Sequence, residues 1–156
     1  MRKPAFIMVA CLLFLASCGI FNKNLELAVQ PDEYQAFFIS FDEKTVTPIQ
    51  EILKKEQVVA DIWFETQDPE IGTLGDEFED LAHKGEPTQV AVYEQAAYKD
   101  LKNIPASIQW KDYIASGSIE KGMVFLVKAS SGNVFKVKLK AFSEEDVKLR
   151  YKRLKE

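Results

Sequence analysis

Hydrophobic and polar residues alternate most regularly in the last third of the chain. In residues 134–142 (VFKVKLKAF), Phe135, Val137, Leu139 and Ala141 occupy every second position. Because successive side chains of a strand point to opposite faces, this pattern predicts a strand with one face in the core. The opposite face, which we expect to be solvated, carries Lys136, Lys138 and Lys140.

The segments on either side predict two partner strands. Residues 123–129 are apolar, and the SSGN sequence at 130–133 supplies the residue types of a tight turn. The SEED sequence at 143–146 is a second turn, and residues 147–152 again alternate between apolar and basic side chains. The C-terminal third is therefore predicted to be a three-stranded antiparallel meander with one face in the core.

Shorter hydrophobic runs upstream predict further strands and a few short helices. Strands are expected at 34–41, 58–64 and 89–93. Thr47 and Pro48 are typical of a helix start, with Thr as N-cap and Pro at the first helical position, for a helix reaching about Gln57. Further short helices are expected at 94–101 and 107–115, and one or two helical turns in the acidic connection at 76–83. The predicted fold is mainly β with a few short helices (α+β), built as an antiparallel sheet or sandwich.

The first nineteen residues have the pattern of an export signal. Arg2 and Lys3 precede an apolar run, residues 5–15, which is too short to cross a hydrocarbon core that takes roughly 20 residues. It ends in Leu15-Ala16-Ser17-Cys18. This order resembles the lipobox of bacterial lipoprotein precursors, in which the signal is cut before the cysteine and the thiol carries a diacylglyceryl group.

The lipobox resemblance implies three parts of the chain. Residues 1–17 would be the signal peptide, residues 18–33 the lipidated N-terminus and tether, and residues 34–156 a single β-rich domain. Two or more acyl chains give stable attachment to a membrane. Gly19 rather than Asp after the cysteine favours the outer membrane of the cell envelope. The alternatives are an ordinary secretory signal with a chance cysteine and an uncleaved membrane anchor.

The charge of the chain argues against a nucleic-acid partner. Without Arg2 and Lys3, the 20 basic and 24 acidic residues become 18 and 24, a formal charge of −6. The charge is also uneven: residues 61–86 hold nine acids and one base, whereas residues 121–156 hold ten bases and four acids. We interpret these stretches as solvated faces, and leave open whether the acidic connection 65–86 binds an ion or a partner.

Few residues have the pattern of a catalytic or metal site. His83 is the only histidine, so a histidine-pair metal site is excluded, and no Gly-x-Ser-x-Gly elbow accompanies it. The acids between Asp76 and Asp80 lack the order of a calcium loop. We therefore expect a non-enzymatic protein without a metal site, in which His83 lies on the surface.

A second resemblance concerns the mature domain. The run at 122–154 (GMVFLVKASSGNVFKVKLKAFSEEDVKLRYKRL) resembles the last three strands of HmuY-like haem-binding lipoproteins, and VVADIWF at 58–64 is similar to the strand before that family's central loop. The resemblance implies a lipid-anchored, extracytoplasmic β-rich fold, and haem clasped between two histidines or methionines. Here the candidate axial ligands are His83 and Met123, and the latter begins an apolar strand and is expected in the core.

Two functions follow from these patterns. The first is an HmuY-like, lipid-anchored binding module that takes haem or another small ligand outside the cytoplasm. The second is an envelope lipoprotein that contacts a protein partner and has no small-molecule ligand.

Overall fold

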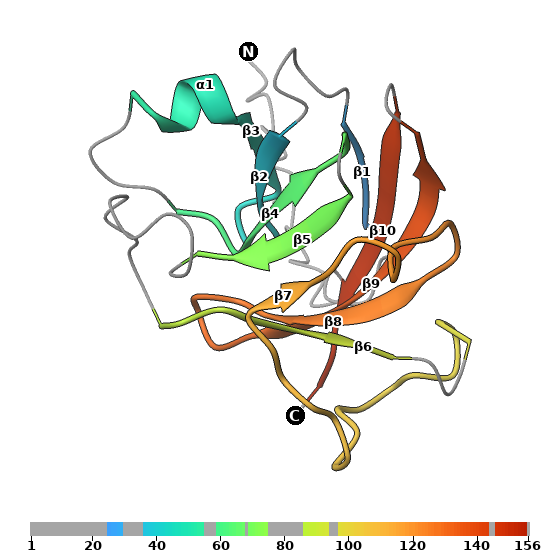
Figure 1. Ribbon diagram of the computed structural model, residues 1–156. Helices are drawn as coiled ribbons and strands as arrows, with labels where there is room; N and C mark the ends of the chain where they lie inside the picture. The colour runs from blue at the N-terminus through green and yellow to red at the C-terminus, as the bar shows by residue number, and fades with distance from the viewer. Residues whose placement is uncertain are drawn as a thin grey trace, which may run out of the picture.

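The strands of the protein form two antiparallel sheets that pack face to face (Figure 1). The computed structural model describes residues 25–29, 36–54, 59–67, 69–74, 86–93, 97–143 and 146–155. Within this part of the chain the only helix is α1, Ile49–Ile52. The prediction of a mainly β, antiparallel fold is confirmed.

The first sheet has the strand order β1-β10-β9-β8-β6. Its strands are β1 (Leu25–Val29), β6 (Gln89–Val92), β8 (Val124–Lys128), β9 (Val134–Phe142) and β10 (Val147–Arg153). Strands β8, β9 and β10 are the predicted meander, with Gly132 at φ 83° in the β8–β9 turn, a conformation that favours glycine. The sequence patterns of the C-terminal third therefore predicted these three strands correctly.

The second sheet has the order β3-β2-β4-β5-β7 and consists of shorter strands. They are β2 (Ala36–Ser40), β3 (Thr45–Pro48), β4 (Ile62–Glu65), β5 (Glu70–Thr73) and β7 (Tyr113–Ile114). The expected strands at 34–41, 58–64 and 89–93 correspond to β2, β4 and β6.

The main core lies between the two sheets. It contains Phe37 and Phe64 of the second sheet, whose rings stack at 5.4 Å, and Phe135, Val137 and Leu139 of the first. These last three are the side chains that the alternation in β9 assigned to the buried face, and all three are buried. Burial of this apolar surface is the dominant stabilising contribution that the structure shows.

The two sheets are joined along one edge by residues 111–114. The backbone N–H of Val90 in β6 donates to the carbonyl of Lys111, and the Lys111 N–H donates back, both at 2.8 Å. One residue later, the Asp112 carbonyl accepts the N–H of Thr73, and β7 pairs with β5. This segment therefore links an edge of the first sheet to the second sheet.

A buried carboxylate, Asp61, joins the sheets at another point. Its Oδ2 accepts the backbone N–H of Phe41 at 2.7 Å, and its Oδ1 accepts the backbone N–H and the hydroxyl of Ser130, each at 3.1 Å. Burial raises the pKa of Asp61 above its usual 3.8, although the hydrogen bonds from Phe41 and Ser130 act in the opposite direction. The side chain ties the end of β2 to the β8–β9 turn.

The outer face of each sheet is also covered. On the second sheet, α1 and Trp63 cover the outer face, and the indole lies over Gly72, where a Cβ atom would collide with it. On the first sheet, residues of the segment 97–110 pack on Val124, Leu126 and Val134. The first sheet is therefore buried on both faces near β8.

Several predicted elements differ from the structure. Residues 25–29, expected in the tether, form β1 and pair with β10. Gly72, expected in a long connection, lies in β5. Thr47 is not the N-cap of α1, because Thr47 and Pro48 belong to β3 and Pro48 itself is the N-cap, with ψ at 150°.

The helices expected at 94–101 and 107–115 are wrong wherever the structure describes them. Residues 97–112 form turns, isolated β-bridges and irregular backbone, and Tyr113–Ile114 is the strand β7. Their apolar side chains, among them Leu101 and Ile108, pack individually on the outer face of the first sheet instead of forming one stripe of a helix. The expected helical turns at 76–83 lie outside the described residues.

Candidate functional site

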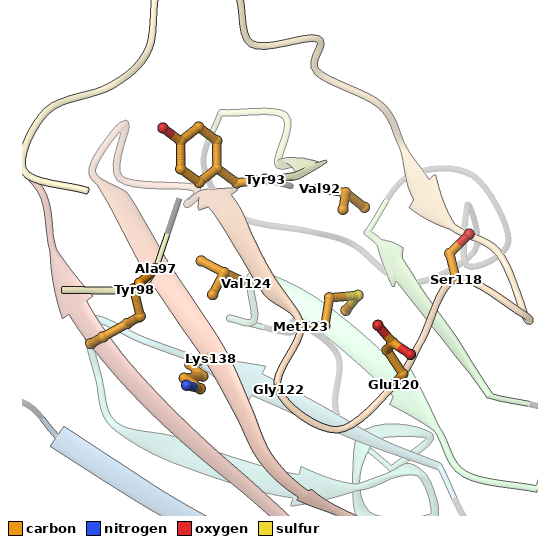
Figure 2. A pocket seen from close by; sticks show the side chains of 10 residues that line it. All are labelled: Val92, Tyr93, Ala97, Tyr98, Ser118, Glu120, Gly122, Met123, Val124 and Lys138. Carbon is orange, nitrogen blue, oxygen red and sulfur yellow. The ribbon is translucent and has the colours of Figure 1, made fainter. Parts of the chain in front are cut away.

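A pocket of about 330 Å³ lies beside the turn at residues 118–123, which precedes β8 (Figure 2). Small-molecule sites usually occupy about 300–1,000 Å³, so this pocket is at the lower end of that range. Its wall comes from the end of β6, from the segments 97–98 and 118–122, and from β8 and β9. The lining residues are Val92, Tyr93, Ala97, Tyr98, Ser118, Glu120, Gly122, Met123, Val124 and Lys138.

Backbone hydrogen bonds hold the floor of the pocket. The Gly122 N–H donates to the Leu139 carbonyl at 2.7 Å, and the Leu139 N–H donates to the Met123 carbonyl at 3.0 Å. Gly122 has φ 98°, which an L side chain rarely adopts, so glycine permits the chain to turn from Glu120 into β8. The Tyr93 N–H donates to the Val124 carbonyl at 2.9 Å and extends the pairing of β6 with β8. Backbone hydrogen bonds therefore fix the course of the chain along this side of the pocket.

The wall combines apolar and polar groups. Val92, Met123 and Val124 offer apolar surface, and in Figure 2 Met123 lies between Val124 and Glu120. The polar groups are two phenols, a hydroxyl, a carboxylate and an ammonium, from Tyr93, Tyr98, Ser118, Glu120 and Lys138. This mixture suits a small ligand with an apolar body and a few polar or charged substituents.

Tyr98 is the more deeply buried of the two tyrosines in this wall. Burial raises the pKa of Tyr98 to about 12. The phenol therefore keeps its proton at neutral pH and is a poor source of the phenolate that binds iron.

Of the site residues predicted from sequence, the structure describes one. Met123 is 8% exposed and belongs to the core between the sheets, as its place in an apolar run indicated, and one side of it lines the pocket. His83 lies outside the described residues, as do Leu15, Ala16, Ser17 and Cys18. The pairing of His83 with Met123 stays a prediction.

Sequence reasoning misassigned one important side chain, Lys136. We expected it on a solvated face, but it is 6% exposed. Its Nζ donates to the carbonyls of Tyr98 at 2.7 Å and Leu101 at 2.6 Å, and it lies 4.5 Å from the centre of the Tyr98 ring. Burial lowers the pKa of Lys136, and the neighbouring Lys152 lowers it further. Lys136 therefore fixes the segment that supplies Tyr98 to the pocket.

The pattern around Lys136 contained a signal for this burial. Residues 124–127 of β8 are continuously apolar rather than alternating, which is typical of a strand covered on both faces. Leu126 of β8 and Lys136 of β9 are neighbours in register, so a segment that packs over Leu126 also packs over Lys136. The pocket residues beyond β8 and β9 had no such signal, because Tyr93, Tyr98 and Glu120 come from separate segments.

The described residues contain neither a metal site nor a membrane-spanning helix. No group of three or more His, Cys, Asp or Glu side chains in this part of the chain is arranged to hold a metal ion. The one described helix is far too short to cross a bilayer.

Comparison with known proteins adds no family assignment. No protein-family model matches the chain, and no curated protein matches it. The resemblance to HmuY-like lipoproteins therefore remains a prediction from residues 58–64 and 122–154.

Proposed function

We propose that this chain is a non-enzymatic, lipid-anchored binding module of the cell envelope, attached to the outer membrane through Cys18. Its ligand site is the pocket between β6, β8 and the segments 97–98 and 118–122. The observation that carries this proposal is the pocket itself, which has a hydrogen-bonded floor and a wall of mixed chemistry. A preformed wall lowers the ordering cost of binding.

Haem is the first ligand to test, because the resemblance implies it and because two donors line the pocket. Met123 offers a thioether and Tyr93 a phenol, both of which ligate haem iron in other proteins. The cation of Lys138 is placed in the same wall and suits a propionate. The small volume of the pocket favours a ligand smaller than haem.

A haemin titration of residues 19–156 tests the ligand. Every strand described above lies within these residues. A Soret shift that saturates at one equivalent supports haem binding in the pocket if Met123→Leu or Tyr93→Phe changes the spectrum, while Tyr113→Phe, an exposed tyrosine on β7, leaves it unchanged. A parallel His83→Ala titration asks whether the histidine is an axial ligand. Absence of any saturable shift excludes haem and directs the search to smaller amphipathic ligands.

Metabolic labelling tests the anchor separately. Cys18→Ala removes the thiol that would carry the diacylglyceryl group, so radioactive palmitate should label the natural chain but not this variant. The variant should also keep its leader, because cleavage at a lipobox follows acylation. Label retained on Cys18→Ala contradicts the anchor without bearing on the pocket.

The second function, an envelope protein that contacts a protein partner, has one observation in its favour. Among the described residues, Leu53, Val59 and Tyr113 are large hydrophobic side chains that stay exposed, at 66%, 39% and 51%. Single exposed hydrophobics are common on monomers, so they favour this function less than the pocket favours the first. Cross-linking in cells through Leu53 or Tyr113 tests it.

A further inference from the structure

A second cavity, of about 450 Å³, lies at the C-terminal end of β10 and has a basic lining that we call the basic groove. Its six cations are Lys99, Lys102, Lys136, Lys152, Arg153 and Lys155. Among the described residues no carboxylate lines it, and the remaining side chains are two leucines and an asparagine. The chain as a whole has a formal charge of −4, so the basic groove concentrates positive charge against the overall balance.

No salt bridge to a cation of the basic groove is found in the part of the chain that the structure describes. The ion pairs found there are Lys140 and Arg150 with Glu26, at 2.9 and 2.6 Å, and Lys148 with Asp146 at 2.8 Å. All three lie away from the basic groove, on β1, β9 and β10 and at Asp146 just before β10. Nearby acids thus neutralise the other end of this face, whereas the charges of Lys99, Lys102, Lys152, Arg153 and Lys155 remain available to an external anion. The ammonium of Lys136 is buried and donates to two carbonyls.

The walls of the basic groove are fixed relative to each other. Lys136 holds the carbonyls of Tyr98 and Leu101 and so fixes the segment that carries Lys99 and Lys102. Asn103 forms a backbone bridge with Lys155, and the Leu154 N–H donates to the Val134 carbonyl at 2.8 Å. Two segments rich in lysine are therefore held on either side of one cavity.

This arrangement costs stability, which argues that the positive charge has a use. Lys152 lies directly opposite Lys136 in the register of β10 and β9, and like charges in that position repel. Asp100 is near enough to favour the charged form of Lys136, but it does not line the cavity. An anion bound between the walls would relieve the repulsion.

The position of the basic groove relative to the N-terminus favours a membrane as the source of the anion. Leu25 pairs with Tyr151, one residue before Lys152 in the wall of the basic groove. Cys18 precedes Leu25 by seven residues, which span at most about 25 Å when fully extended. A lipid on Cys18 therefore keeps this end of the first sheet close to the membrane surface.

We propose that the basic groove binds the phosphate of an anionic lipid headgroup in the membrane that anchors the chain. This inference rests on the proposed anchor at Cys18, and it adds a second, electrostatic contact to that anchor. Basic clusters close to a membrane are attracted to anionic lipids, and the attraction falls off within a Debye length of the surface. The contact would fix the orientation of the domain on the bilayer.

Vesicle partition of residues 19–156, which contain every described strand, tests the proposal, because a protein without the leader and the acyl chains has no apolar anchor that binds every membrane alike. Partition onto phosphatidylcholine vesicles containing phosphatidylglycerol should exceed partition onto pure phosphatidylcholine by at least about tenfold at low salt. Lys99→Glu with Lys102→Glu should bring the two values together. Lys54→Glu with Lys111→Glu, an equal charge change at exposed sites outside the basic groove, should keep most of the preference.

Each outcome decides a separate point. No preference for the anionic vesicles, or equal losses in the two double variants, overturns the basic groove as the site. If inorganic phosphate, at the concentration of the accessible lipid phosphate, releases the protein from the anionic vesicles, the basic groove is a general phosphate site and the assignment to lipid is overturned. If Lys99→Glu with Lys102→Glu lowers the melting temperature, Lys102→Gln with Lys155→Gln replaces it.

Failure of the anchor has its own readout. A chain that takes up no palmitate but prefers anionic vesicles through the basic groove refutes the anchor and leaves the lipid site standing. A chain that takes up palmitate but does not prefer anionic vesicles refutes the lipid site and leaves the anchor standing.

Discussion

The outer face of the first sheet has two ends that differ in almost every physical respect. At one end Lys136 is buried beneath the segment 97–110 and donates to two backbone carbonyls. At the other end Lys140, on the same face of the same strand, is exposed and shares Glu26 with Arg150. The alternation of β9 places both lysines on one face, but the chain packed over that face decides whether a lysine is structural or solvated.

The largest expected effect is at Leu126, which lies on the outer face of the first sheet under the segment 97–110. Leu126→Ala should lower the free energy of unfolding by about 2–5 kcal/mol, because it removes a fully buried side chain. Leu139→Ala, on the inner face, is the matched control and should cost a similar amount. If urea melts show that Leu126→Ala costs less than about 1 kcal/mol, the segment 97–110 does not bury the outer face of the first sheet.

The next difference concerns the two lysines themselves. Lys136→Ala should cost about 1.5–3 kcal/mol, because it leaves the Tyr98 and Leu101 carbonyls without their charged donor. Lys140→Ala should cost about 0.5 kcal/mol or less, as is usual for an exposed ion pair. The two variants are compared by urea unfolding at neutral pH, and equal losses would contradict the distinction drawn between the ends.

The unfolding free energy should rise with pH at both ends, but in different pH ranges, acidic for Glu26 and alkaline for Lys136. Hydrogen bonds and charge from Lys140 and Arg150 lower the pKa of Glu26 below its usual 4.5. Its contribution is therefore present above pH 4.5 and is lost as the pH falls through the lowered value. Glu26→Gln should remove this acid-dependent part of the unfolding free energy, and high salt should weaken it in the natural protein.

At the covered end, burial lowers the pKa of Lys136 below its usual 10.5, so its ammonium is disfavoured in the folded state. The unfolding free energy should rise from this group as the pH increases from the lowered pKa towards 10.5. Lys136→Met, which cannot titrate, should lack this rise when melts are compared across that interval. An identical alkaline profile in the variant would assign the effect to other groups.

The smallest effect should come from Lys138, which lies between the two ends. It is half-buried and lines the pocket, and no ion pair involving it is found among the described residues. Lys138→Ala should change the unfolding free energy by about 0.5 kcal/mol or less. Its effect should instead appear in the dissociation constant of an anionic ligand, measured by titration beside Lys140→Ala.

Regular alternation made part of this fold predictable. Residues 135–141 and 147–152 alternate without interruption, and β9 and β10 are the longest strands among the described residues. Gly72 and Tyr113 lie in strands of four and two residues, too short for a period to be recognised. Short helices were expected at 94–101 and 107–115, but Leu101 and Ile108 pack separately on the sheet.

The candidate site was less predictable than the fold. Met123 was identified because methionine is rare in the chain, and the structure places it in the wall of the pocket. Tyr98 reaches that wall because the Lys136 side chain holds its carbonyl, and Glu120 belongs to the turn before β8, so neither position has a local signature of a site. The burial of Lys136 could be predicted only by considering β8 and β9 together, because the segment that buries Lys136 also buries its neighbour Leu126.

The pairing of β1 with β10 has a consequence for how the protein folds. Leu25 lies beside Tyr151 and Val29 beside Val147, so the first described strand is hydrogen-bonded to the last. The meander β8-β9-β10 closes through short turns and can form early, whereas β1 must wait for nearly the whole chain and pays the entropy of a very long loop. We therefore expect β1 to dock late, which keeps the N-terminal end of the chain extended and accessible until the rest of the first sheet has formed.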